Sequence, residues 1–111
     1  MKVYLSYQRG KIHAEGDFSL ATKELVVKKG SSVSIPISTA PSFRGKASIT
    51  KQRNGTVENG IVICDVRFKS PSTAGNFVTG KSTNGLTAWK TKDGTTIGEL
   101  IKQQAGEKNA Q

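Results

Sequence analysis

The segment from Ser70 to Trp89 limits the possible fold of this chain more narrowly than any other part of the sequence. Ser70 and Pro71 suit a helix start, because a serine hydroxyl accepts a hydrogen bond from a free amide and proline needs no donor in the first turn. Gly80 suits the position after a helix end, because glycine tolerates positive φ. The sequence therefore predicts a short helix that starts at Ser70 and stops at Gly80.

A polar loop follows this helix and leads to the only tryptophan of the chain. The loop ends in Asn84-Gly85, a dipeptide that readily takes positive φ and so predicts a turn. Trp89 beside such a loop can be a core anchor or a stacking surface for a base. We expect the core anchor, with base stacking as the alternative.

The rest of the chain predicts an α+β fold, a small twisted antiparallel sheet packed by two or three short helices. Alternating apolar residues predict a strand near the N-terminus and an extended segment up to Phe18, with Leu25–Val27 as its antiparallel partner. The clearest strand covers residues 61–68, and an edge strand is expected over 33–37. Helices are expected over 42–53, capped by Ser42, and from Thr96, which has capping-box spacing to Glu99.

The length of 111 residues predicts one domain over residues 1–105, followed by a polar, disordered tail over 106–111. The apolar fraction of 34% favours many turns and short elements. No apolar run is long enough to span a membrane, and the N-terminus lacks the apolar core of a signal peptide. We therefore expect no membrane partner and a cytoplasmic location.

Cysteine and histidine are too rare for several kinds of catalytic site. The single Cys64 follows the apolar run Ile61–Ile63 and is expected to be a buried, inert thiol. His13 is the only histidine, so Cys and His ligands cannot assemble a zinc site. We expect His13 to be a surface or partly buried structural residue and not a catalytic base.

The acidic residues also give little support for an enzyme. Glu15 and Asp17 share one face of a predicted strand and could bind a cation or act as a hydrolase pair, but a solvated edge is the expected role. The glycines match neither a phosphate-binding loop nor a dinucleotide-binding motif. The sequence thus predicts a noncatalytic protein with no metal and no cofactor.

The positive charge is the strongest signal in the composition. Seventeen Lys and Arg stand against eight Asp and Glu, for a formal net charge of +9, and the cations are spread along the whole chain. Such an excess favours salt-sensitive binding to nucleic acid, although the same charge could simply maintain solubility.

The candidate nucleic-acid contacts form three groups. The amides of Ser72, Thr73 and Ala74, which follow the expected helix cap Ser70, are expected to hold a phosphate, reinforced by cationic neighbours. Asn84 offers the donor and acceptor that read adenine, next to Gly85, and a stacking Trp89 would lie close by. The cations of the first group are Arg67, Lys69 and Lys81, and those of the helix expected over 42–53 include Arg44, Lys46 and Arg53.

The chain resembles an uncharacterised domain family found fused to GIY-YIG nuclease modules and in proteins of restriction-modification loci. It is also similar to the restriction enzyme adenine methylase associated (RAMA) domain. The shared pieces are Phe68, Ser70-Pro71-Ser72, Ala74, Gly80, Asn84-Gly85, Trp89 and Ile97 to Ile101, with Phe18, Val26-Val27 and Lys29-Gly30-Ser31 upstream. Leu86 stands where the family usually has a first tryptophan.

This resemblance implies a DNA-binding module that reads modified bases or serves as an accessory part of a restriction-modification system. Its expected partners are DNA, including methylated DNA, and a nuclease or methylase protein. The competing interpretation is a protein-interaction or structural module.

Overall fold

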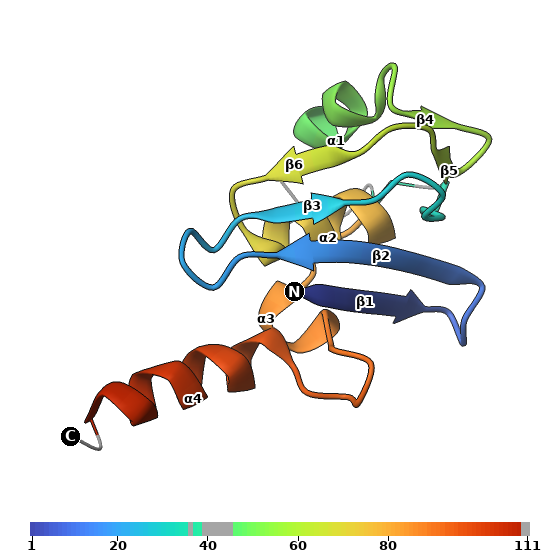
Figure 1. The fold of residues 1–111 in the computed structure, drawn as a ribbon. Helices are drawn as coiled ribbons and strands as arrows, with labels where there is room; N and C mark the ends of the chain where they lie inside the picture. Colours follow the sequence, from blue (N-terminus) through green and yellow to red (C-terminus); the bar gives the residue numbers. More distant parts are fainter. Residues whose placement is uncertain (36, 39–45, 110–111) are drawn as a thin grey trace.

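The computed structural model describes residues 1–35, 37–38 and 46–109, with backbone only for 105–109. These residues form an α+β fold, which confirms the predicted class (Figure 1). The elements in chain order are β1 (Lys2–Tyr7), β2 (Ile12–Phe18), β3 (Leu25–Val27), α1 (Lys46–Arg53), β4 (Val57–Glu58), β5 (Ile61–Val62), β6 (Val66–Phe68), α2 (Pro71–Thr79), α3 (Gly85–Ala88) and α4 (Ile97–Asn109).

The main sheet has four antiparallel strands in the order β1-β2-β3-β6, and a second sheet pairs β4 with β5. Leu5 lies opposite Ala14, and Leu25 lies opposite Phe68. The predicted pairing of residues 12–18 with 25–27 is confirmed. Figure 1 shows α2 behind the main sheet, whereas no described helix crosses its front face, here called the open face.

The core lies between the main sheet and α2. Because side chains alternate across a strand, one set faces the helix and the other lies on the open face. The buried set includes Val3, Leu5, Ala14, Phe18, Leu25, Val27 and Phe68 from the sheet, with Ala74, Phe77 and Val78 from α2. The open face therefore carries the polar residues of the same strands.

The caps of α2 confirm the helix that the sequence predicts. Ser70 has an extended backbone, and its Oγ accepts a hydrogen bond from the Thr73 amide at 3.2 Å. At the other end Gly80 takes the left-handed conformation, with φ of 75°, and its amide donates to the Asn76 carbonyl at 2.8 Å. The helix is thus fixed at both ends by local chemistry.

The turn predicted at Asn84-Gly85 is wrong, because Gly85 is the first residue of α3 and has no positive φ. The Asn84 Oδ1 caps this helix by accepting from the Leu86 amide at 3.1 Å. A Cβ at Gly85 would lie 2.1 Å from the carbonyl carbon of Pro71. The glycine is therefore required by the close approach of α3 to the start of α2, and not by its own backbone angles.

The strand predicted over 61–68 is split into β5 and β6, which belong to different sheets. The Asp65 carboxylate between them accepts from the Lys29 amide at 2.8 Å and from the Lys28 ammonium at 2.9 Å. These bonds hold the chain in the crossing between the two sheets. Cys64 lies in this crossing and is exposed, so the expectation of a buried thiol is wrong.

Other boundaries also differ from expectation. The edge strand expected over 33–37 is replaced by a single bridge between Ser32 and Ile61 in the described part of this segment. The described helix in the 42–53 region begins at Lys46, and Ser42 lies outside the described residues.

The helix expected from Thr96 is present as α4. The Glu99 amide donates to the Thr96 Oγ1 at 3.2 Å, as the predicted capping spacing requires.

The C-terminal helix α4 continues past residue 105, into the segment expected to be a disordered tail. It extends away from the sheet in Figure 1. Within the described ranges, the structure has no helix with the length and apolar character needed to cross a membrane.

Candidate nucleic-acid interface

The start of α2, expected to hold a phosphate, is occupied by the protein's own acceptors. The Thr73 amide donates to the Ser70 Oγ, and the Ala74 amide donates to the Ser70 carbonyl at 3.2 Å. The Ser72 Oγ accepts from the Gly85 amide at 3.0 Å, which joins α3 to this end of α2. Two of the three amides expected to bind a phosphate thus already have partners.

Trp89 is a core residue. Its side chain has 0% exposure, and the indole N–H donates to the Pro71 carbonyl at 3.0 Å. The core interpretation is confirmed, since a buried ring cannot stack on a base while the protein is folded. Asn84 is exposed, but its side-chain oxygen caps α3.

The cations expected to reinforce the start of α2 lie at opposite ends of the helix. Lys69 precedes the N-cap Ser70, whereas Lys81 follows the C-cap Gly80. A helix of nine residues separates the two lysines by roughly 13 Å along its axis. Arg67 is exposed and lies 4.0 Å from Glu24. The structure therefore does not bring Arg67, Lys69 and Lys81 together at one phosphate.

Arg53, expected to contact a phosphate, holds α1 against α2. Its Nε and Nη2 donate to the Phe77 carbonyl at 3.1 and 2.6 Å, and its guanidinium lies 5.8 Å from the Phe77 ring centroid. Burial lowers the pKa of Arg53, which is half-buried. Lys46 and Lys51 on the same helix are exposed, and Arg44 lies outside the described residues.

Acidic residues are distributed very unevenly between the two sides of the molecule. No Asp or Glu occurs between residues 25 and 57 or between residues 66 and 92. These two stretches supply α1, α2 and α3. The acids of the main sheet instead lie on the open face or at its strand ends, as Glu15, Asp17, Glu24 and Asp65. The helical side therefore carries cations without acidic neighbours from its own segments.

A groove of about 340 Å³ lies between the tip of the β1–β2 hairpin and the C-terminal end of α2. We call it the tip groove. Its described lining contains Tyr7, Gln8, Ser34, Ile37, Ser38, Thr79, Gly80 and Lys81, and includes no acid. The Lys81 Nζ lies 4.6 Å from the Tyr7 ring centroid, so a cation–π contact holds the ammonium at the groove.

The hairpin tip adds two exposed cations, Arg9 and Lys11. Gln8 and Arg9 have positive φ of 54° and 57°, a conformation that costs a non-glycine residue about 1–3 kcal/mol. Neither Arg9 nor Lys11 was among the residues expected to bind nucleic acid. The absence of any acid in residues 1–14 is the sequence signal that could have indicated them.

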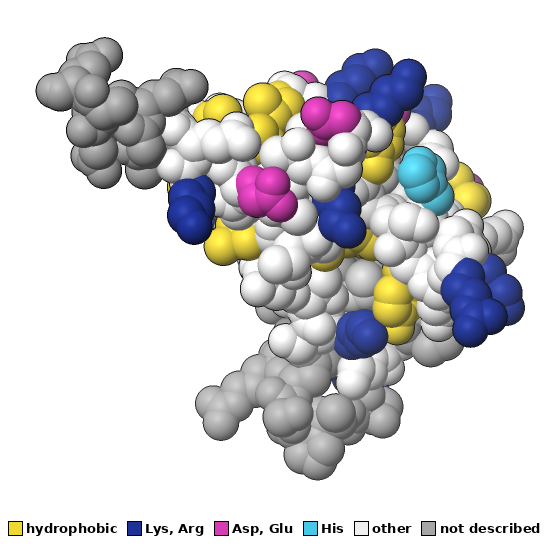
Figure 2. Space-filling model, turned by 90° about the horizontal axis from the view of Figure 1, so that it is seen from below, with side chains coloured by type: hydrophobic (Ala, Val, Ile, Leu, Met, Phe, Trp, Pro, Cys, Tyr) yellow, Lys and Arg dark blue, Asp and Glu magenta, His cyan; other side chains and the backbone are white. Residues whose placement is uncertain are grey.

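Not every face of the molecule carries its cations together. In the view of Figure 2, Lys and Arg side chains form separate groups, with Asp and Glu side chains between some of them. A phosphate that approaches this face would meet carboxylates as well as ammonium groups. The tip groove, lined without acids, is the more favourable surface for a polyanion.

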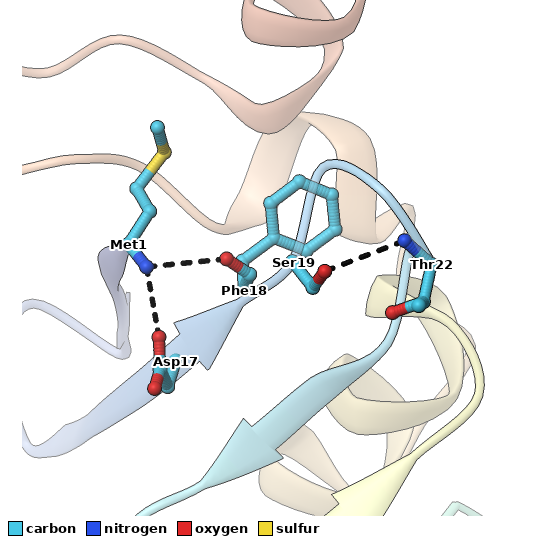
Figure 3. Close-up of polar contacts among 5 residues, drawn as sticks. All are labelled: Met1, Asp17, Phe18, Ser19 and Thr22. Atoms are coloured by element: carbon cyan, nitrogen blue, oxygen red, sulfur yellow. Dashed lines mark hydrogen bonds and ion pairs between the residues drawn. The ribbon is translucent and has the colours of Figure 1, made fainter.

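Of the two carboxylates considered for a cation site, Glu15 and Asp17, the Asp17 carboxylate is already paired with an amino group. The terminal amino group of Met1 donates to the Asp17 Oδ1 at 2.8 Å and to the Phe18 carbonyl at 3.3 Å, while the Ser19 Oγ accepts from the Thr22 amide (Figure 3). The hydrogen bond and charge of this amino group lower the pKa of Asp17. Among the described residues, no three His, Cys, Asp or Glu side chains are placed to hold a metal.

Comparison with known proteins identifies a family for this chain. No curated protein and no solved structure matches the chain. A family model described as "Domain of unknown function (DUF4357)" matches residues 5–101, which includes the end of β1, the other three strands of the main sheet, α2 and α3. The chain belongs to this DUF4357 domain family.

Proposed function

We propose that the protein is a noncatalytic nucleic-acid-binding module that holds the backbone of DNA against the tip groove. The observation that carries this proposal is the lack of acidic residues in the segments that form α1, α2 and α3, in a chain with a net charge of +9. A surface without carboxylates lets each lysine neutralise a phosphate without first breaking an ion pair.

Lys81, Arg9 and Lys11 are the groups that would contact phosphates. Lys81 is positioned by the Tyr7 ring, so less side-chain freedom is lost when it binds. Arg9 and Lys11 extend the same surface along the hairpin tip. Arg53 would contribute indirectly, by fixing α1 and its exposed Lys46 and Lys51 to α2.

A more specific role is suggested by the resemblance of the sequence to domains of restriction-modification loci and to the RAMA domain. In this role the module brings DNA to a nuclease or methylase partner and distinguishes methylated from unmethylated adenine. The buried Trp89 cannot serve as the base-reading ring, so base recognition would need other side chains.

A second candidate function is binding to an acidic protein surface. Ile35 and Ile61 are 70% and 44% exposed and line a groove together with Lys11. Apolar side chains beside a cation suit a protein partner as well as a polyanion.

A charge-reversal experiment tests the proposed function. The affinity for labelled duplexes, adenine-methylated and unmethylated, is measured by anisotropy titration at low and near-physiological salt. Three proteins are compared: the wild type, Lys11→Glu/Lys81→Glu and Lys92→Glu/Lys102→Glu. The two double variants have the same net charge, but Lys102 lies on α4 and Lys92 lies in the segment before α4. Loss of binding only in the Lys11/Lys81 variant supports the tip groove. No binding by the wild type at low salt would favour the protein partner.

A further inference from the structure

A small hollow lies on the open face of the main sheet, between β2 and the turn after β3. It has a volume of about 240 Å³ and is lined by His13, Glu15, Lys29, Gly30 and Ser31. On the β1 side, the Tyr4 ring stacks on the His13 ring, with 5.9 Å between the centroids and 20° between the planes. The hollow and Tyr4 therefore flank β2 on opposite sides.

Two serine hydroxyls hold the turn against β2. The Ser31 Oγ accepts from the Glu15 amide at 3.0 Å and donates to the Glu15 carbonyl at 3.3 Å. The Ser32 Oγ accepts from the His13 amide at 2.8 Å and donates to the His13 carbonyl at 3.2 Å. Both residues that supply functional groups from β2 are thus fixed in their backbone relative to the turn.

In the described part of the chain, the hydrogen-bonding atoms of the His13 and Glu15 side chains have no partner, although Asp65 and, more weakly, the Glu15 charge raise the pKa of Lys28. Within the described residues, neither the Glu15 carboxylate nor the imidazole nitrogens of His13 make a hydrogen bond or an ion pair. By contrast, Asp17 and Asp65 are tied to amino groups. The hollow therefore presents an aromatic ring, two free carboxylate oxygens and the exposed cation Lys29.

We propose that this hollow binds an unpaired guanine base of a bound nucleic-acid strand. Guanine is the base with two adjacent N–H donors on its Watson–Crick edge, and a carboxylate has two acceptor oxygens to match them. The Glu15 carboxylate takes these two donors, and the His13 ring, supported from behind by Tyr4, stacks on the base. Lys29 contacts the adjoining phosphate.

The size of the hollow agrees with a single base. Pockets for drug-sized ligands have about 300–1,000 Å³, and this hollow is smaller. The base must be unpaired, because Glu15 would contact the edge that a complementary base otherwise occupies. This inference rests on the proposed function for the source of the strand, but the base site can be tested without it.

The direct test uses guanosine monophosphate (GMP) and thymidine monophosphate (TMP) as probes. Because His13 is the only histidine, its imidazole C–H signals in the proton NMR spectrum need no further assignment. GMP is expected to shift these signals saturably, and TMP, which carries the same phosphate, is expected to shift them much less. Equal shifts by the two nucleotides would show phosphate binding alone and overturn the proposal.

A conservative variant tests the role of Glu15. Glu15→Gln keeps the size of the side chain but replaces one acceptor oxygen by a donor, so GMP affinity should fall about tenfold, as for loss of a bidentate contact. Lys92→Glu/Lys102→Glu, at and before α4, serves as the control and should leave GMP affinity unchanged. Unaltered affinity in Glu15→Gln, with an unchanged amide spectrum as evidence of folding, would remove the carboxylate from the site.

Oligonucleotides then separate the base site from the proposed function. A ten-residue oligothymidylate with one central guanine should bind about tenfold more tightly than the same strand without it. Glu15→Gln should abolish this difference, whereas Lys11→Glu/Lys81→Glu should weaken both strands alike. Failure of both strands to bind would count against the proposed function, and the GMP titration would still decide the base site.

Discussion

The indole N–H of Trp89 donates a hydrogen bond to the carbonyl oxygen of Pro71 at 3.0 Å, and this bond ties the residue after α3 to the first residue of α2. The Gly85 amide makes a parallel connection to the Ser72 Oγ. The start of α2 is therefore an internal junction. The Thr73 and Ala74 amides at this junction donate to Ser70, so they are not open to a phosphate.

Replacement of Trp89 by phenylalanine should destabilise the protein by about 2–4 kcal/mol, because it leaves the buried Pro71 carbonyl without its donor and removes part of a large core side chain. The free energy of unfolding can be measured by urea denaturation followed by circular dichroism. A Trp89→Phe protein as stable as the wild type would contradict the role of this bond.

Gly85→Ala should lower the free energy of unfolding by at least about 2 kcal/mol, because the new methyl group would meet the backbone of Pro71. Thr87→Ala, at an exposed position of the same helix, is the matched control and should change stability by less than about 1 kcal/mol. Similar melting temperatures for the two variants would mean that α3 and α2 do not approach so closely.

Substitutions of Arg53 and Lys51, both on α1, should affect different properties of the protein: Arg53→Ala its stability and Lys51→Ala its affinity for DNA. Arg53→Ala removes the hydrogen bonds to the Phe77 carbonyl and should cost about 1.5–3 kcal/mol of stability. Lys51→Ala should leave the unfolding transition unchanged and reduce only affinity for DNA. Thermal unfolding and anisotropy titration of both variants check this. If Arg53→Ala melts like the wild type, Arg53 does not fasten α1.

The contact between Asp65 and Lys28 should make stability depend on acidity. Hydrogen bonds from Lys28 and from the Lys29 amide lower the pKa of Asp65 in the folded state. A group whose pKa is lowered by folding stabilises the protein above its unfolded pKa, and this contribution is lost as pH falls below about 4. Asp65→Asn should therefore be less stable than the wild type at pH 7, with the difference shrinking toward pH 3. Urea denaturation midpoints of both proteins at pH 7 and at pH 3 measure this difference in stability. A difference that stays the same at the two pH values would count against the lowered pKa of Asp65.

Local chemistry accounts for the parts of the fold that the sequence predicts well. Ser70, Pro71 and Gly80 define α2 through caps that need no distant partner. The pairing of β2 with β3 follows from alternating apolar residues. The fold class could be predicted because these elements do not depend on tertiary context.

Tertiary contacts account for the features of the fold and of the candidate site that the sequence did not predict. The exposure of Cys64 depends on Asp65, which draws the chain toward Lys28 and Lys29, far away in the sequence. The need for glycine at position 85 comes from Pro71. In the candidate site, Lys81 is separated from Lys69 by a whole helix and joins Tyr7 instead. Nothing local to these residues indicates such partners.

The most direct test of the central claim is the salt dependence of duplex binding. Each lysine–phosphate contact contributes about 0.9 to the slope of log affinity against log salt concentration. Lys11→Gln/Lys81→Gln should therefore reduce the magnitude of the wild-type slope by about 2, and the control Lys92→Gln/Lys102→Gln should leave it unchanged. Equal slopes for the wild type and both double variants would show that DNA does not bind at the tip groove.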